Sequence, residues 1–287
     1  MQILKGALRD PGSGLVLSTQ AQLAEFLERS NPGGFDPYKL EKDFYLTAFL
    51  GHVARDFPEL VFKGGTCLNK VYFDYFRLSE DLDFVLRLDA NRAGRQKALS
   101  ACKESLVAIA ARLGLSFDAS RRTSHDEHRQ GLFSFGYASV INRSAQAIRV
   151  DVTVRPALRL EPVAREVKSV FRDVVFGVPF FAPCKIACMD LREAMAEKLR
   201  AAMTRPEPAI RDFYDLAYVR RHAPDFDFES IRPLVRAKLE ESAYAYTYRD
   251  ALEFLRSRIR PELAPVVRDA DAFDLDAAFR FVAGFEA

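Results

Sequence analysis

Long apolar runs are missing from this sequence of 287 residues. A helix that crosses a membrane needs about 18 consecutive apolar residues, and no segment approaches that length. Hydrophobic residues make up 49% of the chain and charged residues 29%, both close to the averages of globular proteins. We therefore expect a soluble protein with no membrane partner.

Cysteine is also scarce. The four cysteines, Cys67, Cys102, Cys184 and Cys188, form no disulfide framework, and no histidine near the last two could complete a zinc site. Residues 1–9 lack the apolar stretch and the cleavage site of a secretory signal. The sequence thus predicts a cytoplasmic protein with reduced, mostly buried thiols.

An excess of charge of one sign is absent as well. Lysine and arginine number 42 against 40 aspartates and glutamates, so net charge alone does not predict a nucleic-acid-binding surface. Such a surface would have to come from local clusters of basic residues.

Hydrophobic periodicity predicts an α/β protein in three parts: N-terminal helices (1–57), an α/β core (58–182) and a C-terminal helical domain (183–287). The expected helices are 18–29, 40–56, 68–76, 99–113, 190–203, 211–221, 229–244, 251–258 and 274–285. The expected strands are 60–62, 81–88, 132–138, 148–154 and 170–178.

A glycine pair, Gly64-Gly65, lies between the first expected strand and the helix after it, flanked by Lys63 and Thr66. Two glycines let backbone N–H groups approach an anion closely, and Thr66 adds a hydroxyl. This arrangement suits the phosphates of a nucleotide. Taken alone, it is also the pattern of an ordinary turn.

Asp81 and Asp83 are two residues apart on an expected strand. Because side chains alternate along a strand, both carboxylates point to one side, while Leu82 and Phe84 point into the core. Two convergent carboxylates suit Mg²⁺, which takes its remaining oxygen ligands from phosphates and water. The alternative is a solvated strand end.

Asp151 stands among apolar residues on another expected strand. A buried, unpaired carboxylate costs several kcal/mol unless a partner or a metal compensates it. Asp151 could therefore complete a metal site, or it could form a salt bridge with Arg149 or Arg155.

The Gly-Gly-Thr turn, the Asp-x-Asp strand fifteen residues after Thr66 and the later strand aspartate resemble the polymerase-β type of nucleotidyltransferase. Four segments are similar to the AbiEii toxin family, the nucleotidyltransferase-like toxins of bacterial AbiE-type toxin–antitoxin and phage-defence systems. They are Glu41-Lys42-Asp43, Phe62 to Leu68, Arg77 to Phe84, and Ala196 to Ala201.

The resemblance places the family's first motif on Gly64, Gly65, Thr66, Asp81 and Asp83. It also places the family's lysine on Lys198 and its late aspartate on Asp212.

The residues themselves leave the roles of Lys198 and Asp212 open. Lys198 borders the apolar face of its expected helix, so it could contact a triphosphate or be a solvated flank residue. Asp212 opens the next helix, where a carboxylate is favoured whatever the function, and Asp215 could pair with Arg211.

Two basic segments could touch RNA. The loop 121–129 contains His125 and His128, but we interpret it first as solvated, then as an RNA-phosphate contact, and only last as a metal site. Arg220-Arg221-His222 ends a helix, where basic residues already balance the helix dipole.

Together these features predict an enzyme that transfers a nucleoside monophosphate from a nucleoside triphosphate (NTP) to an acceptor with Mg²⁺ or Mn²⁺. The expected metal ligands are Asp81, Asp83 and Asp151, which with Lys198 and Asp212 make up the expected catalytic residues. The expected nucleotide contacts are Lys63, Gly64, Gly65, Thr66, Ser79 and Lys198.

The resemblance implies a tRNA or other RNA acceptor and a separately encoded antitoxin. A protein hydroxyl or a small molecule stays open as the acceptor, and so does a binding module with a vestigial site.

Overall fold

The computed structural model describes residues 3–9, 16–31, 34–120, 123–173, 177–241 and 245–286. The chain divides into two compact units. The first comprises Met1–Leu158 and Pro162–Met189, and the second comprises Arg159–Glu161 and Asp190–Ala287. The division at residues 57 and 182 stays a prediction.

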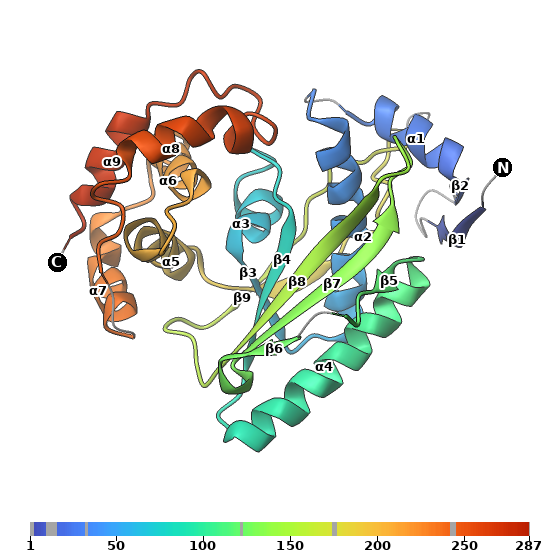
Figure 1. Ribbon diagram of the computed structural model, residues 1–287, viewed down its shortest axis with the longest axis horizontal. Helices are drawn as coiled ribbons and strands as arrows, with labels where there is room; N and C mark the ends of the chain where they lie inside the picture. Colours follow the sequence, from blue (N-terminus) through green and yellow to red (C-terminus); the bar gives the residue numbers. More distant parts are fainter. Residues whose placement is uncertain are drawn as a thin grey trace. The chain divides into compact units, whose positions relative to one another are not determined.

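An eight-stranded mixed sheet forms the centre of the first unit (Figure 1). Its strand order is β5-β7-β8-β4-β3-β10-β9, and β6 pairs with β7. β4 runs parallel to β8 and β10 runs parallel to β3, while the other pairs are antiparallel. The strands are β3 (Leu60–Lys63), β4 (Asp81–Arg87), β5 (Ser116–Phe117), β6 (Ser124–His125), β7 (Gln130–Ala138), β8 (Ala145–Arg155), β9 (Val163–Glu166) and β10 (Lys185–Cys188).

Three helices complete the core of this unit: α1 (Gln20–Arg29), α2 (Pro37–Asp56) and α4 (Arg92–Arg112). One cluster of buried side chains joins them to the sheet, with Phe44 of α2 and Leu106 of α4 among its members. Leu82 and Phe84 belong to the same cluster, so β4 buries one face. The alternate residues, which include Asp81 and Asp83, therefore lie on the face away from that core.

Side-chain caps fix where the first two helices begin. Thr19 and Gln22 form a reciprocal capping box at α1, and the Asp36 carboxylate accepts from the backbone N–H groups of Tyr38 and Lys39 at α2. A two-stranded antiparallel sheet, β1 (Ile3–Arg9) with β2 (Val16–Thr19), precedes α1. The periodicity argument did not predict this hairpin.

Two local predictions were wrong. The expected helix 68–76 begins earlier, as α3 (Gly64–Cys67), and continues as a π-helical turn, Leu68–Tyr72. It ends there because Asp74 and Tyr75 have positive φ angles, which a helix cannot accommodate. The expected strand 170–178 forms only an isolated bridge from Arg172 to Pro179, and residues 174–176 of it lie outside the described part of the chain.

Helices make up the described part of the second unit. They are α5 (Leu191–Thr204), α6 (Ile210–His222), α7 (Arg232–Glu240), α8 (Leu252–Arg258) and α9 (Leu275–Ala283), with short turns at Glu229–Ile231 and Ile259–Leu263. Leu199, Phe213 and Val282 are fully buried and belong to its core. Part of the expected helix 229–244, residues 242–244, lies outside the described residues.

The α/β fold class, with helices at both ends of the chain, is confirmed. None of the helices in the described ranges is both long enough and apolar enough to span a membrane.

Candidate active site

Strand pairing brings three predicted site residues side by side. Lys63 on β3 is the register partner of Asp83 on β4, and Asp83 is the register partner of Asp151 on β8. Register partners on neighbouring strands share one face and stand roughly 5 Å apart. Asp81 lies on the same face as Asp83, opposite Arg149. Lys63, Asp81, Asp83 and Asp151 are all partly accessible to solvent.

The glycine pair packs directly against this row. Gly64 has φ +76°, and a Cβ atom there would stand 2.1 Å from Oδ2 of Asp83. A Cβ atom at Gly65 would stand 2.5 Å from Nη2 of Arg77 and 3.1 Å from Oγ of Ser79. A side chain at Gly64 would collide with Asp83, and one at Gly65 would displace the ends of Arg77 and Ser79, so the pair is more than an ordinary turn. It lets the start of α3 touch the Asp83 carboxylate.

Thr66 ties α3 to β4. Its hydroxyl donates to the backbone carbonyl of Asp81 at 2.5 Å, and the residue is fully buried. The expectation that this hydroxyl is offered to a phosphate is thus corrected, because the hydroxyl already binds the first residue of β4, Asp81. The backbone N–H of Thr66 lies in the first turn of a helix, where such groups have no partner within the helix.

Asp151 is held by an amide rather than by an arginine. Its Oδ2 accepts from Nε2 of Gln130 at 2.6 Å, while its Oδ1 is buried without a hydrogen-bond partner in the described part of the chain. Arg149 is exposed, and neither it nor Arg155 is the hydrogen-bond partner found for Asp151, so the salt-bridge alternative is corrected.

Burial raises the pKa of Asp151, and the charge of Asp81 adds to that rise. The Gln130 hydrogen bond, the nearby Lys63 charge and a hydrogen bond with Thr153 oppose it only in part. The Asp151 carboxylate therefore holds a proton more readily than an ordinary aspartate does.

The segment before Asp81 is anchored to α2 by charge. Glu80 binds Lys39 at 2.7 Å and Lys42 at 3.0 Å. Burial alone would raise the pKa of Glu80, but the two ammonium groups outweigh it and lower this pKa to about 2. The two ion pairs thus hold the residue before β4, the strand that carries both metal-ligand candidates, against α2.

The neighbours of Lys42 are structural too. Asp43 forms a fully buried ion pair with Lys70 at 2.8 Å, and Tyr75 hydrogen-bonds to both. Glu41 accepts from the hydroxyl of Ser139 at 2.6 Å and from the next backbone N–H at 2.7 Å, which fixes the connection between β7 and β8. The segment Glu41-Lys42-Asp43 therefore supports the frame around the carboxylates.

In the second unit, Lys198 lies between two carboxylates. Its ammonium is 2.7 Å from Asp212 and 2.8 Å from Asp215, and the side chains are 13%, 3% and 0% exposed. Arg205 stands 2.8 Å from the other oxygen of Asp212. The solvated-flank alternative for Lys198 is thus corrected, while the possible pairing of Asp215 with Arg211 stays a prediction. Lys198 joins α5 to α6.

No three His, Cys, Asp or Glu side chains come together as a ready metal site within the described ranges. In the histidine loop, Nδ1 of His128 lies 2.6 Å from the Ser124 hydroxyl. All four cysteines are free thiols, as expected. A metal held by Asp81 and Asp83 could complete its shell with oxygen atoms of a substrate and of water.

Comparisons with known proteins identify the family. The family described as "Nucleotidyl transferase AbiEii toxin, Type IV TA system" matches residues 48–282. That range contains every predicted site residue from Lys63 to Asp212. The chain belongs to the AbiEii nucleotidyl transferase toxin family. It is accordingly a nucleotidyltransferase and a toxin of the toxin–antitoxin type, and the resemblance inferred from the sequence motifs is confirmed.

Solved structures agree on the fold. MenT4, a nucleotidyltransferase toxin from Mycobacterium tuberculosis, superposes with a TM-score of 0.55 at 18% identity, over 93% of this chain and 89% of that one. JHP933 from Helicobacter pylori superposes with a TM-score of 0.50 at 17% identity, over 86% and 90%. No curated protein matches the chain. These structures share the AbiEii chain's nucleotidyltransferase fold.

Two residues near the carboxylates in this AbiEii chain were not singled out from the sequence. Arg77 is almost fully buried, covers Gly65 and donates from Nη1 to the carbonyl of Leu78 at 2.8 Å. Gln130 holds Asp151. The position of Arg77 at the start of a segment that resembles the family was a usable signal, whereas nothing in the sequence pairs Gln130 with Asp151.

Proposed function

We propose that this AbiEii chain transfers a nucleoside monophosphate from an NTP to an RNA acceptor through a divalent cation held by Asp81 and Asp83. The observation that carries the proposal is the row formed by Lys63, Asp83 and Asp151, with the Asp83 carboxylate against Gly64. Carboxylates crowded on one sheet face beside a glycine turn suit a bound cation and phosphates better than they suit an empty surface.

The donor set fits Mg²⁺ or Mn²⁺. Mg²⁺ is commonly bound by one or two carboxylates, with substrate phosphates and water completing its shell. Asp81 and Asp83 supply such a pair on one face of β4. When bound, the cation would polarise the phosphate oxygens and offset their charge.

The other residues bind and orient the nucleotide. The backbone N–H groups of Gly64, Gly65 and Thr66 would hold phosphate oxygens, with Lys63 adding positive charge and Ser79 standing over Gly65. These contacts would place the α-phosphorus for attack by an acceptor hydroxyl.

Asp151 would take the proton of the attacking hydroxyl. A raised pKa brings a carboxylate closer to the proton affinity that a general base needs. The new bond joins the acceptor oxygen to the α-phosphorus, the bond from that phosphorus to the β-phosphate oxygen breaks, and pyrophosphate leaves. Asp151 would otherwise serve as a further metal ligand through its unpartnered Oδ1.

Lys198 and Asp212 stay proposed members of the catalytic set, with Lys198 offsetting charge on the triphosphate. Because two buried carboxylates hold Lys198, its charge is available only if a phosphate competes with them. Membership of a toxin family supports a cognate antitoxin. A role in phage defence is a further part of the proposal. We expect a tRNA acceptor in the cytoplasm, where tRNA and NTPs are found.

The test is transfer of label from each of the four NTPs, with Mg²⁺, to total tRNA, to the protein itself or to a small hydroxyl compound such as an aminoglycoside. We expect label on RNA, lost in Asp81→Ala and Asp83→Ala. Asp89→Ala removes an exposed carboxylate two residues after β4 and serves as the matched control. Label on protein or on the small molecule alone would reject the RNA acceptor, and full activity of Asp83→Ala would reject the site.

A further inference from the structure

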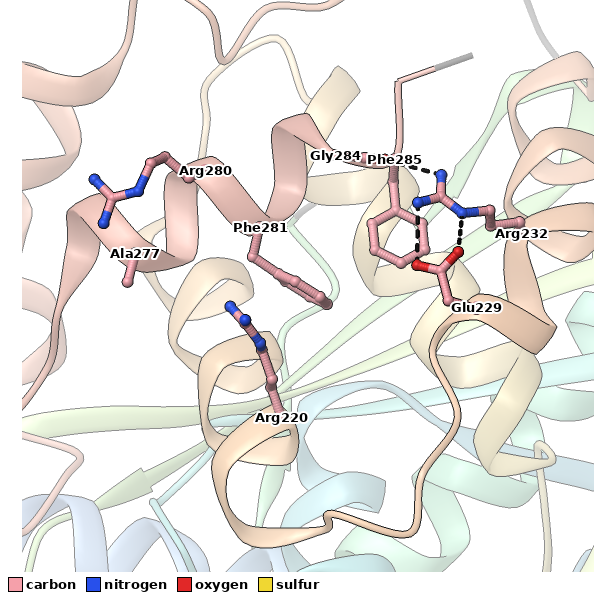
Figure 2. A pocket seen from close by; sticks show the side chains of 8 residues that line it. All are labelled: Arg220, Glu229, Arg232, Ala277, Arg280, Phe281, Gly284 and Phe285. Atoms are coloured by element: carbon pink, nitrogen blue, oxygen red, sulfur yellow. Dashed lines mark hydrogen bonds and ion pairs between the residues drawn. The ribbon is translucent and has the colours of Figure 1, made fainter.

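A basic and aromatic pocket lies within the second unit, and none of the carboxylates described above lines it (Figure 2). It has a volume of about 410 Å³, within the usual range of ligand sites. The end of α6, the turn before α7 and the last turns of α9 supply its walls. The lining residues are Arg220, Glu229, Arg232, Ala277, Arg280, Phe281, Gly284 and Phe285.

One of the three arginines is already neutralised. Arg232 binds both oxygens of Glu229, at 2.5 and 3.1 Å, and donates to the carbonyl of Gly284 at 2.8 Å (Figure 2). Its guanidinium also lies 4.4 Å from the centre of the Phe285 ring. Arg232 is therefore part of the wall rather than a free cation.

Arg220 and Arg280 have no acidic partner in the described part of the chain. The guanidinium carbon of Arg220 lies 4.9 Å from the centre of the Phe281 ring (Figure 2). A ring beneath a guanidinium orients it by a cation–π contact and leaves its N–H edge available for an anion. Arg280, the residue before Phe281 on α9, is exposed, and its side chain points away from Phe281 (Figure 2).

Helix dipoles explain one arginine at each helix end, but not why both line the same pocket. Arg220 and Arg280 occupy the last turns of α6 and α9, where a cation is favoured. Two cations without an acidic partner among the described residues nevertheless give this pocket a positive potential that attracts an anion. Guanidinium groups bind phosphate through paired N–H bonds, which makes phosphate a well-matched anion.

We propose that this pocket binds a backbone phosphate of the acceptor RNA, with Arg220 and Arg280 as the phosphate contacts and Phe281 as the shelf that orients Arg220. The inference rests on the proposed function for its choice of ligand. Arg232 already binds both oxygens of Glu229, so the charge left to hold an anion comes from Arg220 and Arg280, and competition with polyglutamate separates RNA from an acidic peptide.

The test measures the affinity of the intact protein for fluorescently labelled total tRNA over a range of salt concentrations. The double variant Arg220→Ala/Arg280→Ala should bind about tenfold more weakly, with a salt slope smaller by about one to two, since each lost phosphate contact removes about 0.9. Arg220→Lys keeps the charge but not the fork of donors, and it should fall between the wild type and the double variant.

Arg221→Ala is the matched control. It removes the same charge from the same exposed helix end, one residue away and outside the pocket lining. This variant should change affinity less than about twofold, a surface-charge effect without the pocket contact. Wild-type affinity in the double variant, an equal loss in Arg221→Ala, or displacement of the tRNA by polyglutamate as efficiently as by unlabelled tRNA would each overturn the proposal.

Failure of this inference and failure of the proposed function give different results. If the wild type labels tRNA and the double variant does so with an unchanged KM, the pocket assignment fails and the function stands. If tRNA binding depends on Arg220 and Arg280 but no label reaches RNA, the transfer function fails and the binding site stands.

Discussion

Replacing Gly64 by alanine tests the close approach of α3 to Asp83. A non-glycine residue at φ +76° is strained by about 1–2 kcal/mol. The new methyl group would also stand 2.1 Å from Oδ2, 2.8 Å from Cγ and 3.0 Å from Cβ of Asp83. Rotating the carboxylate relieves the first two contacts but not the third, because Cβ is fixed to the strand backbone.

Forcing such a contact typically costs about a further 1–3 kcal/mol, so Gly64→Ala should lower the free energy of unfolding by about 2–5 kcal/mol in total. Because the relief moves the Asp83 carboxylate, nucleotide transfer should fall with it, by at least about tenfold. Urea denaturation followed by circular dichroism, together with the transfer assay, measures both effects.

Two other glycines separate strain from collision. Gly34 has φ +61° with nothing within 4 Å of a built Cβ, so Gly34→Ala should cost only the strain of about 1–2 kcal/mol and leave transfer intact. Gly51 lies inside α2 with open space around it, so Gly51→Ala should stabilise the protein by about 0.5–1 kcal/mol. A Gly64→Ala protein as stable as Gly34→Ala and as active as the wild type would refute the reasoning.

Three further predictions concern buried charges. Asp151→Asn should abolish transfer but raise the free energy of unfolding at neutral pH, because the native fold raises the Asp151 pKa above 3.8 and makes its ionisation there unfavourable. The gain should vanish in acid, where Asp151 is protonated in both the folded and the unfolded protein. A gain unchanged by pH would contradict this. Lys198→Ala should cost about 3–5 kcal/mol in urea denaturation, since it removes the ammonium that bridges two buried carboxylates. A loss under about 1 kcal/mol would show that they do not depend on it. Asp43→Ala should cost about 3–5 kcal/mol by stranding the buried ammonium of Lys70, and the double change with Lys70→Met should recover part of that loss; no recovery would place the cost elsewhere.

The sequence predicted those parts of the site that depend on neighbours along the chain. The two-residue spacing of Asp81 and Asp83 places both on one face of β4, because side chains alternate along any strand. The glycine pair between a strand and a helix likewise indicated a place where the backbone comes close to another group.

Contacts between distant segments could not be predicted in this way. The register that sets Asp83 beside both Lys63 and Asp151 depends on which strands pair, and alternation within a strand carries no such information. The same holds for Gln130 on Asp151 and for Lys198 between Asp212 and Asp215. Hydrophobic patterning placed Lys198 on a helix flank without showing what faces that flank.

Short strands were missed for a related reason. β9 and β10 have four residues each, which is too few for an alternation of apolar and polar residues to be recognised. β10 also ends at Cys188, which is fully buried. The π-helical turn after α3 was missed because apolar spacing alone does not distinguish it from a longer α-helix.

The central claim is that Asp81 and Asp83 support nucleotidyl transfer to RNA, and the position of the transferred phosphate tests it most directly. Each NTP is supplied once labelled at the α-phosphate and once at the γ-phosphate, with Mg²⁺ and total tRNA, to the wild type and to Asp83→Asn. The account predicts that the α-label becomes attached to tRNA in the wild type, that the γ-label does not, and that Asp83→Asn attaches neither. Attachment of the γ-label, or equal α-labelling by Asp83→Asn, would contradict it.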